Sequence, residues 1–193
     1  MGLEDMFIQT EQTPNPLTVK FLPGVEVMKT GTIDFRNKDE ADCSPLASRL
    51  FQLESVEGVF LSSDFVSITK SEEASWQELK PIVLGIIMEH FVSQQPVIHD
   101  DIVVNNPKQD TKYDESDAEV VGQIRELLDV RVRPAVAQDG GDIEFRGFKE
   151  GVVFLQLQGS CQGCPSATMT LKMGIENMLK HYIPEVVEVR AVN

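Results

Sequence analysis

A stretch with little sustained apolar periodicity, residues 95–116, divides the 193-residue sequence into two parts. Asn105-Asn106-Pro107 lies inside this stretch, and runs of Asn and Pro are typical of turns and loops. A chain of this length accommodates one or two domains but leaves little room for three. We therefore expect two domains, residues 1–95 and 116–193, joined by a flexible linker over residues 96–115.

The first part combines the two-residue period of strands with the 3.6-residue period of helices. Thr13-Pro14-Asn15-Pro16 predicts a turn between two strands, and Ser44-Pro45 predicts the N-cap and first residue of a short helix. Ser75 is the expected N-cap of a longer helix, in which Pro81 predicts either a kink or a later start. The expected strands are residues 7–10, 17–21, 56–61 and 65–69. The first domain is therefore predicted to be α+β.

The second part predicts elements in the order α-β-β-α-β. An apolar stripe that begins after Ser116 and ends before Pro134 predicts the first helix. Alternating apolar residues on both sides of Lys149-Glu150-Gly151 predict a hairpin. A helix that ends at Pro184 and a strand over residues 186–192 complete the order. The sequence thus predicts two small α+β domains.

Acidic residues outnumber basic ones throughout the chain. Asp and Glu total 31 against 17 Lys and Arg, so the formal net charge is -14. A protein that binds nucleic acid needs a basic surface for the phosphate backbone, and we expect neither nucleic acid nor an anionic membrane as a partner. We also expect no membrane span, because no window approaches the roughly 18 consecutive apolar residues that a span needs.

Cys161 and Cys164 form a C-x-x-C pair on the loop between the second hairpin strand and the following helix. Three cysteines in all are too few for a disulfide framework, so we interpret the pair as thiols in a reducing compartment and Cys43 as an ordinary thiol. Pro165 suits the first position of a helix, where unpaired N–H groups favour the thiolate form. Glycines beside the pair indicate an exposed loop suited to metal binding or disulfide exchange.

The number of available ligands restricts the kind of site. Zinc and four-iron clusters ordinarily take four protein ligands, and this domain offers two cysteines and His181, which lies near the far end of the following helix. A metal site would therefore need Cys161 and Cys164 from each of two subunits related by a twofold axis. A thiol-disulfide adaptor that uses the same pair, and a zinc-bridged dimer, remain alternatives.

Three segments of the second part resemble the NifU-like domain of iron-sulfur cluster assembly proteins. They are residues 159–166 (G-S-C-x-x-C-P-S), Gly140-Gly141-Asp142, and residues 126–134 from Glu-Leu-Leu-Asp to Arg-Pro. Residues 6–16 are similar to the start of the Nfu N-terminal domain. The combination resembles the two-domain Nfu proteins of mitochondria and related bacteria.

This resemblance implies a non-catalytic scaffold or carrier of iron-sulfur clusters. It implies that Cys161 and Cys164 ligate a [4Fe-4S] cluster shared between two subunits of a homodimer. The expected partners are upstream cluster-assembly proteins and the apo iron-sulfur proteins that accept the cluster. The expected location is the cytoplasm for a bacterial protein or the mitochondrial matrix for a eukaryotic one.

Overall fold

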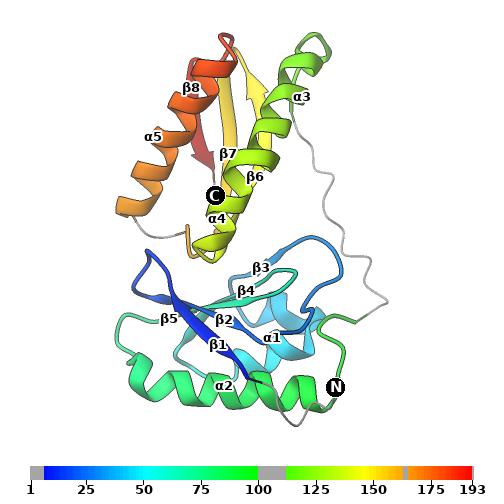
Figure 1. Ribbon diagram of the computed structural model, residues 1–193, viewed down its shortest axis with the longest axis vertical. Coiled ribbons are helices and arrows are strands. Elements are labelled where there is room, and N and C mark those ends of the chain that lie inside the picture. Colours follow the sequence, from blue (N-terminus) through cyan, green and yellow to red (C-terminus); the bar gives the residue numbers. More distant parts are fainter. Residues whose placement is uncertain (1–6, 100–111, 163–164, 193) are drawn as a thin grey trace. The chain divides into compact units, whose positions relative to one another are not determined.

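The chain folds into two compact units, Met1–Asn105 and Asn106–Asn193, each built from helices packed on one sheet (Figure 1). The computed structural model describes residues 7–99, 112–162 and 165–192. For residues 165–168 it describes the backbone alone. The predicted α+β class in two domains is confirmed. None of the helices described for the chain is long and apolar enough to cross a membrane.

The first unit contains a five-stranded antiparallel sheet in the order β1-β2-β5-β4-β3. Its strands are β1 (Gln9–Gln12), β2 (Thr18–Leu22), β3 (Ile33–Phe35), β4 (Val56–Leu61) and β5 (Val66–Lys70). The predicted turn between β1 and β2 is present, because the Thr13 hydroxyl donates to the carbonyl oxygens of Asn15 and Thr18 at 2.9 and 3.0 Å. Strand β3 and the 3-10 helix η2 (Asp39–Cys43) were not predicted.

Helices α1 (Pro45–Leu50) and α2 (Trp76–Val92) pack on one face of this sheet (Figure 1). Ser44 is the N-cap of α1, as predicted, and its hydroxyl accepts the amide of Ala47 at 3.1 Å. Ser75 caps α2 in the same way, and Pro81 lies inside that helix rather than at its start. The apolar sides of both helices and of the sheet form the core of the unit.

The second unit has a three-stranded sheet in the order β6-β7-β8. Strands β6 (Gly141–Lys149) and β7 (Val152–Gly159) form the predicted antiparallel hairpin, and β8 (Glu188–Val192) pairs with β7 in parallel. A parallel neighbour requires a crossover connection. Helix α5 (Pro165–Tyr182) provides it, so the start of α5 lies at the end of the central strand.

The sequence predicted that the first helix of this unit ends before Pro134. That prediction is wrong, because the helical segment continues past this residue. It consists of α3 (Ala118–Leu127), a π-helical stretch (Leu128–Val132) and α4 (Arg133–Gln138). Proline lacks an amide hydrogen and its ring collides with the carbonyl one turn earlier in a regular helix. The wider π turn comes immediately before α4, where Pro134 occupies the first turn and needs no intrahelical donor.

Both ends of the predicted linker contact the unit beside them. The Ser44 hydroxyl donates to the carbonyl oxygen of Val97 at 2.6 Å, and the His99 amide donates to the carbonyl oxygen of Cys43 at 3.0 Å. On the other side, the Phe148 amide donates to the carbonyl oxygen of Lys112 at 3.2 Å. Residues 100–111 lie outside the described residues, and the boundaries 1–95, 96–115 and 116–193 stay a prediction.

Candidate metal centre

The C-x-x-C pair lies on the connection from β7 to α5, the strand-loop-helix setting that the sequence predicts. Strand β7 ends at Gly159, whose φ of 63° is in the left-handed region. Glycine adopts this conformation without the steric cost that a side chain adds. The Gln162 amide donates to the Gly159 carbonyl oxygen at 3.1 Å, which closes a tight turn around Cys161.

Cys161 is buried, with 6% of its surface exposed, and it belongs to the apolar core of the second unit. The prediction of an exposed loop is therefore wrong at this residue. The reason lies in the neighbouring strand β6, which begins with Gly141 and so has no side chain there to keep the sulfur away. A Cβ added at Gly141 would lie 3.0 Å from Sγ and 3.3 Å from the amide nitrogen of Cys161.

Ser160 fastens the loop to the turn before β6. Its amide donates to the carbonyl oxygen of Gly140 at 3.2 Å, and its hydroxyl donates to the carbonyl oxygen of Asp139. Gly140 has a φ of 80°, in the left-handed region, and it forms the turn that leads into β6. The Ser160 Oγ also lies 3.9 Å from the Cys161 Sγ. The position of the thiol thus depends on two backbone segments that are about 20 residues apart in the sequence.

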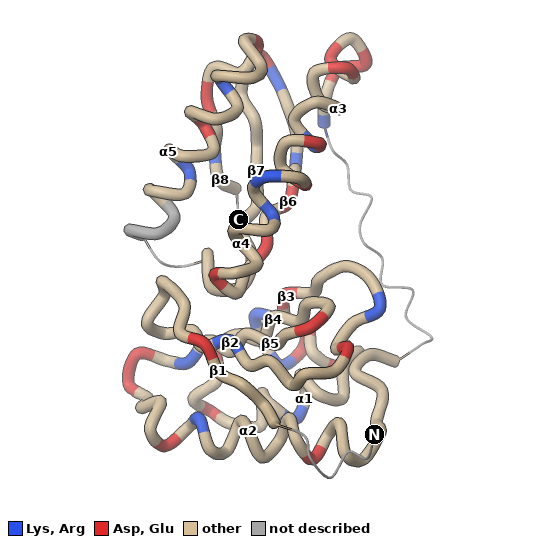
Figure 2. The backbone as a smooth tube through the Cα atoms, viewed as in Figure 1, with Lys and Arg blue, Asp and Glu red and all other residues tan. Residues whose placement is uncertain are grey.

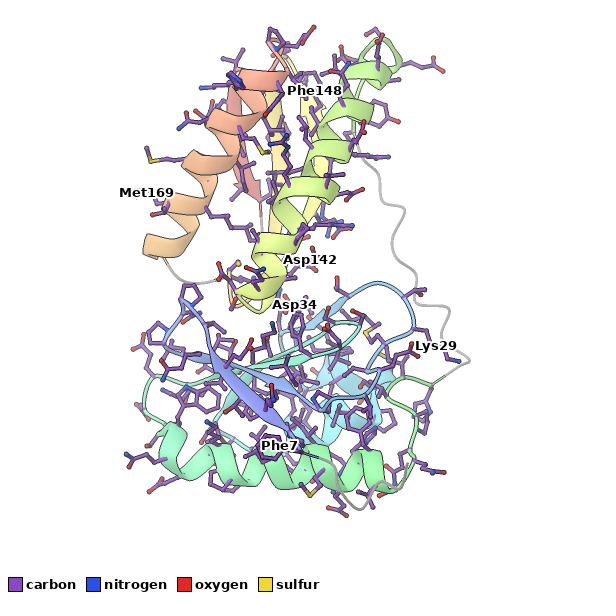
Figure 3. The ribbon with its side chains drawn as sticks, viewed as in Figure 1. Phe7, Lys29, Asp34, Asp142, Phe148 and Met169 are labelled. Carbon is purple, nitrogen blue, oxygen red and sulfur yellow. The ribbon has the colours of Figure 1, made fainter. Side chains whose placement is uncertain are left out.

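Arg133 connects the start of α4 to the start of β6. Its Nε lies 3.4 Å from the Asp142 carboxylate and donates to the carbonyl oxygen of Ile143 at 3.2 Å, while its Nη1 lies 3.1 Å from the Asp129 carboxylate. Asp142 also accepts the Ile143 amide at 2.7 Å. Asp142, labelled in Figure 3, directly follows the glycine that contacts Cys161, so this network orients the strand that supports the thiol.

Sequence reasoning named both thiols but missed this supporting structure. The roles of Ser160 and Gly141 depend on the pairing of β6 with β7, in which Gly141 lies opposite Gly159. The sequence did contain a signal for this pairing. Gly141 begins the first hairpin strand and Gly159 ends the second, and both lie at similar distances from the turn between the strands. Two facing glycines predict a close approach of something bulky, which here is the cysteine sulfur.

Among the other candidate ligands, His181 is the one whose place in the second unit the structure describes. Cys164, the second predicted ligand, lies outside the described residues. His181 follows the first residue of α5 by sixteen positions, or about 24 Å of helix, and its ring packs against Tyr182. Cys43 belongs to the first unit, and burial raises the pKa of its thiol. Among residues 7–99, 112–162 and 165–192, no group of three His, Cys, Asp or Glu side chains could hold a metal ion.

Comparison with known families accounts for both units. Residues 8–94 match the family described as "Scaffold protein Nfu/NifU N terminal", and residues 124–190 match the "NifU-like domain". The chain belongs to the Nfu/NifU scaffold family. The resemblance that the sequence motifs indicated is therefore confirmed.

Known relatives of the Nfu/NifU family match the chain from end to end. Proteins named "NFU1 iron-sulfur cluster scaffold homolog, mitochondrial" from Drosophila erecta and Drosophila yakuba are each 53% identical over 192 residues, which is 99% of this chain. The chain spans 66% of the length of these two relatives. The Drosophila persimilis protein of the same name is 50% identical over 193 residues, with 67% of its length covered.

Among solved structures, a NifU-like protein from Saccharomyces cerevisiae is similar to part of the chain. The sequence identity is 27%, the match covers 49% of this chain and 86% of that one, and the TM-score is 0.45.

Proposed function

We propose that this protein is a non-catalytic scaffold and carrier that binds a [4Fe-4S] cluster between two subunits and transfers it to apo-proteins. Cys161 and Cys164 of each subunit are the ligands. Membership of the Nfu/NifU scaffold family carries this proposal, together with the thiol loop at the end of β7. The names of the Drosophila relatives support a mitochondrial location. Upstream assembly proteins supply the cluster, and apo iron-sulfur proteins accept it.

The ligand count supports a shared cluster. Four thiolates are the usual ligand set of a four-iron cluster, and one NifU-like domain has two cysteines. His181 is about 24 Å of helix away from the start of α5 and does not complete the set. A twofold dimer supplies the same two cysteines twice, so that cluster binding and dimer formation are linked.

The helix that follows the loop offsets part of the cluster charge. A [4Fe-4S] unit with four thiolates carries about two negative charges in its common oxidised state. The first amides of α5 have no partner within the helix and, with the helix dipole, favour an anion at this end. Two copies of α5 thus provide favourable electrostatics to a cluster that lies between subunits, close to solvent.

Release of the cluster proceeds by ligand exchange. Thiolates of the acceptor replace Cys161 and Cys164 one at a time, in the way that an attacking thiolate replaces a leaving one. No bond in the carrier is made or broken apart from those to iron. Because Cys161 is buried between β6 and the loop in the described structure, its sulfur turns outward when the cluster binds.

Anaerobic reconstitution with iron and sulfide tests the proposal. The wild-type protein should become brown, with about four irons per dimer. Cys161→Ser and Cys164→Ser should each lose most of the bound iron, whereas the matched control Cys43→Ser, in the first unit, should keep it. Delivery is tested by incubating the loaded protein with an apo-protein that requires a [4Fe-4S] cluster and by measuring the activity that returns.

The two alternatives give different results, one in the reconstitution and the other in metal analysis of the purified protein. A thiol-disulfide adaptor would remain colourless and would form a reversible bond between Cys161 and Cys164. A zinc-bridged dimer would contain about one zinc and no iron when purified without air. Iron retained in the absence of both thiols, or held by a single subunit, would refute the proposal.

A further inference from the structure

Helix α5 has an exposed face that carries two methionines close to the thiol loop. Met169 and Met173 are 65% and 60% exposed, and in Figure 3 Met169 points away from the sheet. Residues three and four apart lie on the same side of a helix. Thr170, Gly174 and Asn177 are also exposed, and with the two methionines they form what we name the methionine face.

The methionine face is separate from the side of α5 that packs on the sheet. Ile175 and Leu179 are buried in the core of the second unit. Nothing lies within 4 Å of a Cβ built on Gly174, so the surface beside Met173 is open. The methionines are therefore apolar surface that the folded unit leaves uncovered.

The charge of α5 differs from that of the whole chain. The chain has 31 acidic and 17 basic residues, whereas the 18 residues of α5 include two lysines and one acidic residue. That residue, Glu176, pairs with Lys180 at 2.7 Å and also accepts the Val189 amide. Figure 2 shows acidic residues along α2 and around the loops of the first unit, in contrast with this helix. Two copies with a charge of -14 each repel one another least where acidic side chains are few and paired with lysine, as on α5.

We propose that the methionine face is the surface through which a second copy of this chain docks, an inference that rests on the proposed function. Thiols at the start of α5 from two subunits can share one cluster only if the two helix starts approach each other. Met169 and Met173 follow Pro165 by about 6 and 12 Å along the helix axis, so they lie next to that meeting point.

A twofold contact brings the same surface from each subunit together. Methionine suits such a contact because its flexible side chain fills irregular gaps. Gly174 has no side chain and lets the partner helix come close. The cluster and the methionine face then stabilise one dimer jointly, the first through four thiolates and the second through apolar contact.

The test is the dissociation constant of the loaded dimer, measured by anaerobic sedimentation velocity over a concentration series. The double variant Met169→Glu/Met173→Glu should raise this constant about tenfold or more, because like charges then meet across the interface. The double variant Met169→Leu/Met173→Leu should remain within about twofold of wild type, since volume-conserving apolar replacements are tolerated. The control Val130→Glu changes a valine of the same unit that is 67% exposed, and it should have no effect.

A charge-swap experiment tests the face-to-face contact directly. Mixing the Glu double variant with Met169→Lys/Met173→Lys should restore dimers that contain one chain of each kind. Equal dimerisation of the wild type and the Glu variant would overturn the inference. Slower delivery to an apo-protein by a Glu variant that dimerises normally would also overturn it and would assign the face to acceptors.

Failure of this inference is distinguishable from failure of the proposed function. At saturating protein concentration the Glu variant keeps both thiols and should hold the same iron per dimer as wild type. Loss of the proposed function would instead appear in the wild type, as absent iron or as iron that does not depend on Cys161 and Cys164.

Discussion

Replacing Gly141 with alanine tests whether the start of β6 holds the thiol loop in place. A Cβ at this position would lie 2.5 Å from the carbonyl oxygen of Gln158 and 3.0 Å from the Sγ of Cys161. The Gln158 carbonyl belongs to β7, which is paired with β6 over its whole length, so it cannot move without disturbing the sheet. The sulfur is the more movable neighbour, and we expect the loop around Cys161 to shift.

The size of the effect follows from two opposing contributions. Overpacking a well-packed site costs about 1 to 3 kcal/mol. Replacing glycine with alanine also lowers the entropy of the unfolded chain, which stabilises the fold by about 0.4 to 1 kcal/mol. The difference is a net loss of about 1 kcal/mol at the middle of both ranges and at most about 2.6 kcal/mol for Gly141→Ala. In a domain of this size, each kcal/mol lowers the Tm by about 4 to 8 °C.

Calorimetry of the cluster-free full chain measures this loss for the second unit, while the transition of the first unit serves as an internal reference. The matched control is Gly122→Ala on α3, where a Cβ would meet nothing within 4 Å. That change should raise stability by about 0.5 to 1 kcal/mol, because glycine is unfavourable inside a helix. Amide resonances of residues 158–162 should shift in Gly141→Ala and remain in place in Gly122→Ala.

A Gly141→Ala protein with an undiminished Tm and unchanged resonances at residues 158–162 would refute this reasoning. Iron binding gives an independent readout. Because the sulfur has to turn away from β6 to bind the cluster, the variant should bind at least as much iron per dimer as wild type under equal reconstitution at temperatures well below its Tm.

Three further substitutions test other contacts. Burial, reinforced by the nearby charge of Arg49 and opposed by the backbone of Gln95, lowers the pKa of His90 below its ordinary value of 6.5, and within the described part of the chain its two buried ring nitrogens make no hydrogen bond of normal geometry. The unfolded chain therefore binds a proton at higher pH than the folded one, and stability falls as the pH drops below about 6.5. In His90→Leu the free energy of unfolding, measured by urea titrations at pH 7.5 and pH 5.5, should depend less on pH than in the wild type, and the first unit should be stabilised by about 1 kcal/mol. A steeper dependence of the unfolding free energy on pH would contradict this. Ser44→Ala removes the N-cap of α1 and the bond to Val97, so it should cost about 1 to 2 kcal/mol and speed hydrogen exchange around residues 97–99. Glu176→Ala removes the bond from α5 to β8 and should lower the Tm of the second unit, while Glu176→Gln, which can still accept that bond, should lower it less.

Local sequence signals predicted the elements that depend on neighbouring residues. Ser44 and Pro45 begin α1, and the turn at residues 13–16 joins β1 to β2, because capping and turn formation involve groups only a few positions apart. The hairpin of β6 and β7 followed from alternation on both sides of a short turn. These features needed no knowledge of the tertiary structure.

Features that depend on distant segments could not be predicted in this way. The short strand β3 pairs with β4 across more than 20 residues, and its three residues give too short a pattern to stand out. Pro134 was expected to stop a helix, because sequence alone does not reveal the π turn before it or the burial of Val132 and Val136 in the core on either side of it. The burial of Cys161 depends on a glycine in another strand.

The organisation of the second unit explains how a protein can bind a cluster and also release it. Its core consists of apolar side chains from all three strands and from α3, α4 and α5, so the fold has a source of stability that does not include a metal. Structural zinc domains behave differently, since the metal supplies most of their folding free energy and its loss unfolds them. In the carrier that we propose, only the dimer contact and the thiolate bonds would depend on the cluster. On this proposal, an acceptor that takes the cluster leaves behind a folded chain, and we expect its loop to return to the described arrangement, with Ser160 bonded to the turn before β6 and Cys161 against Gly141. In this proposed scheme release requires separation of the two subunits, so we expect dilution of the loaded protein to favour transfer.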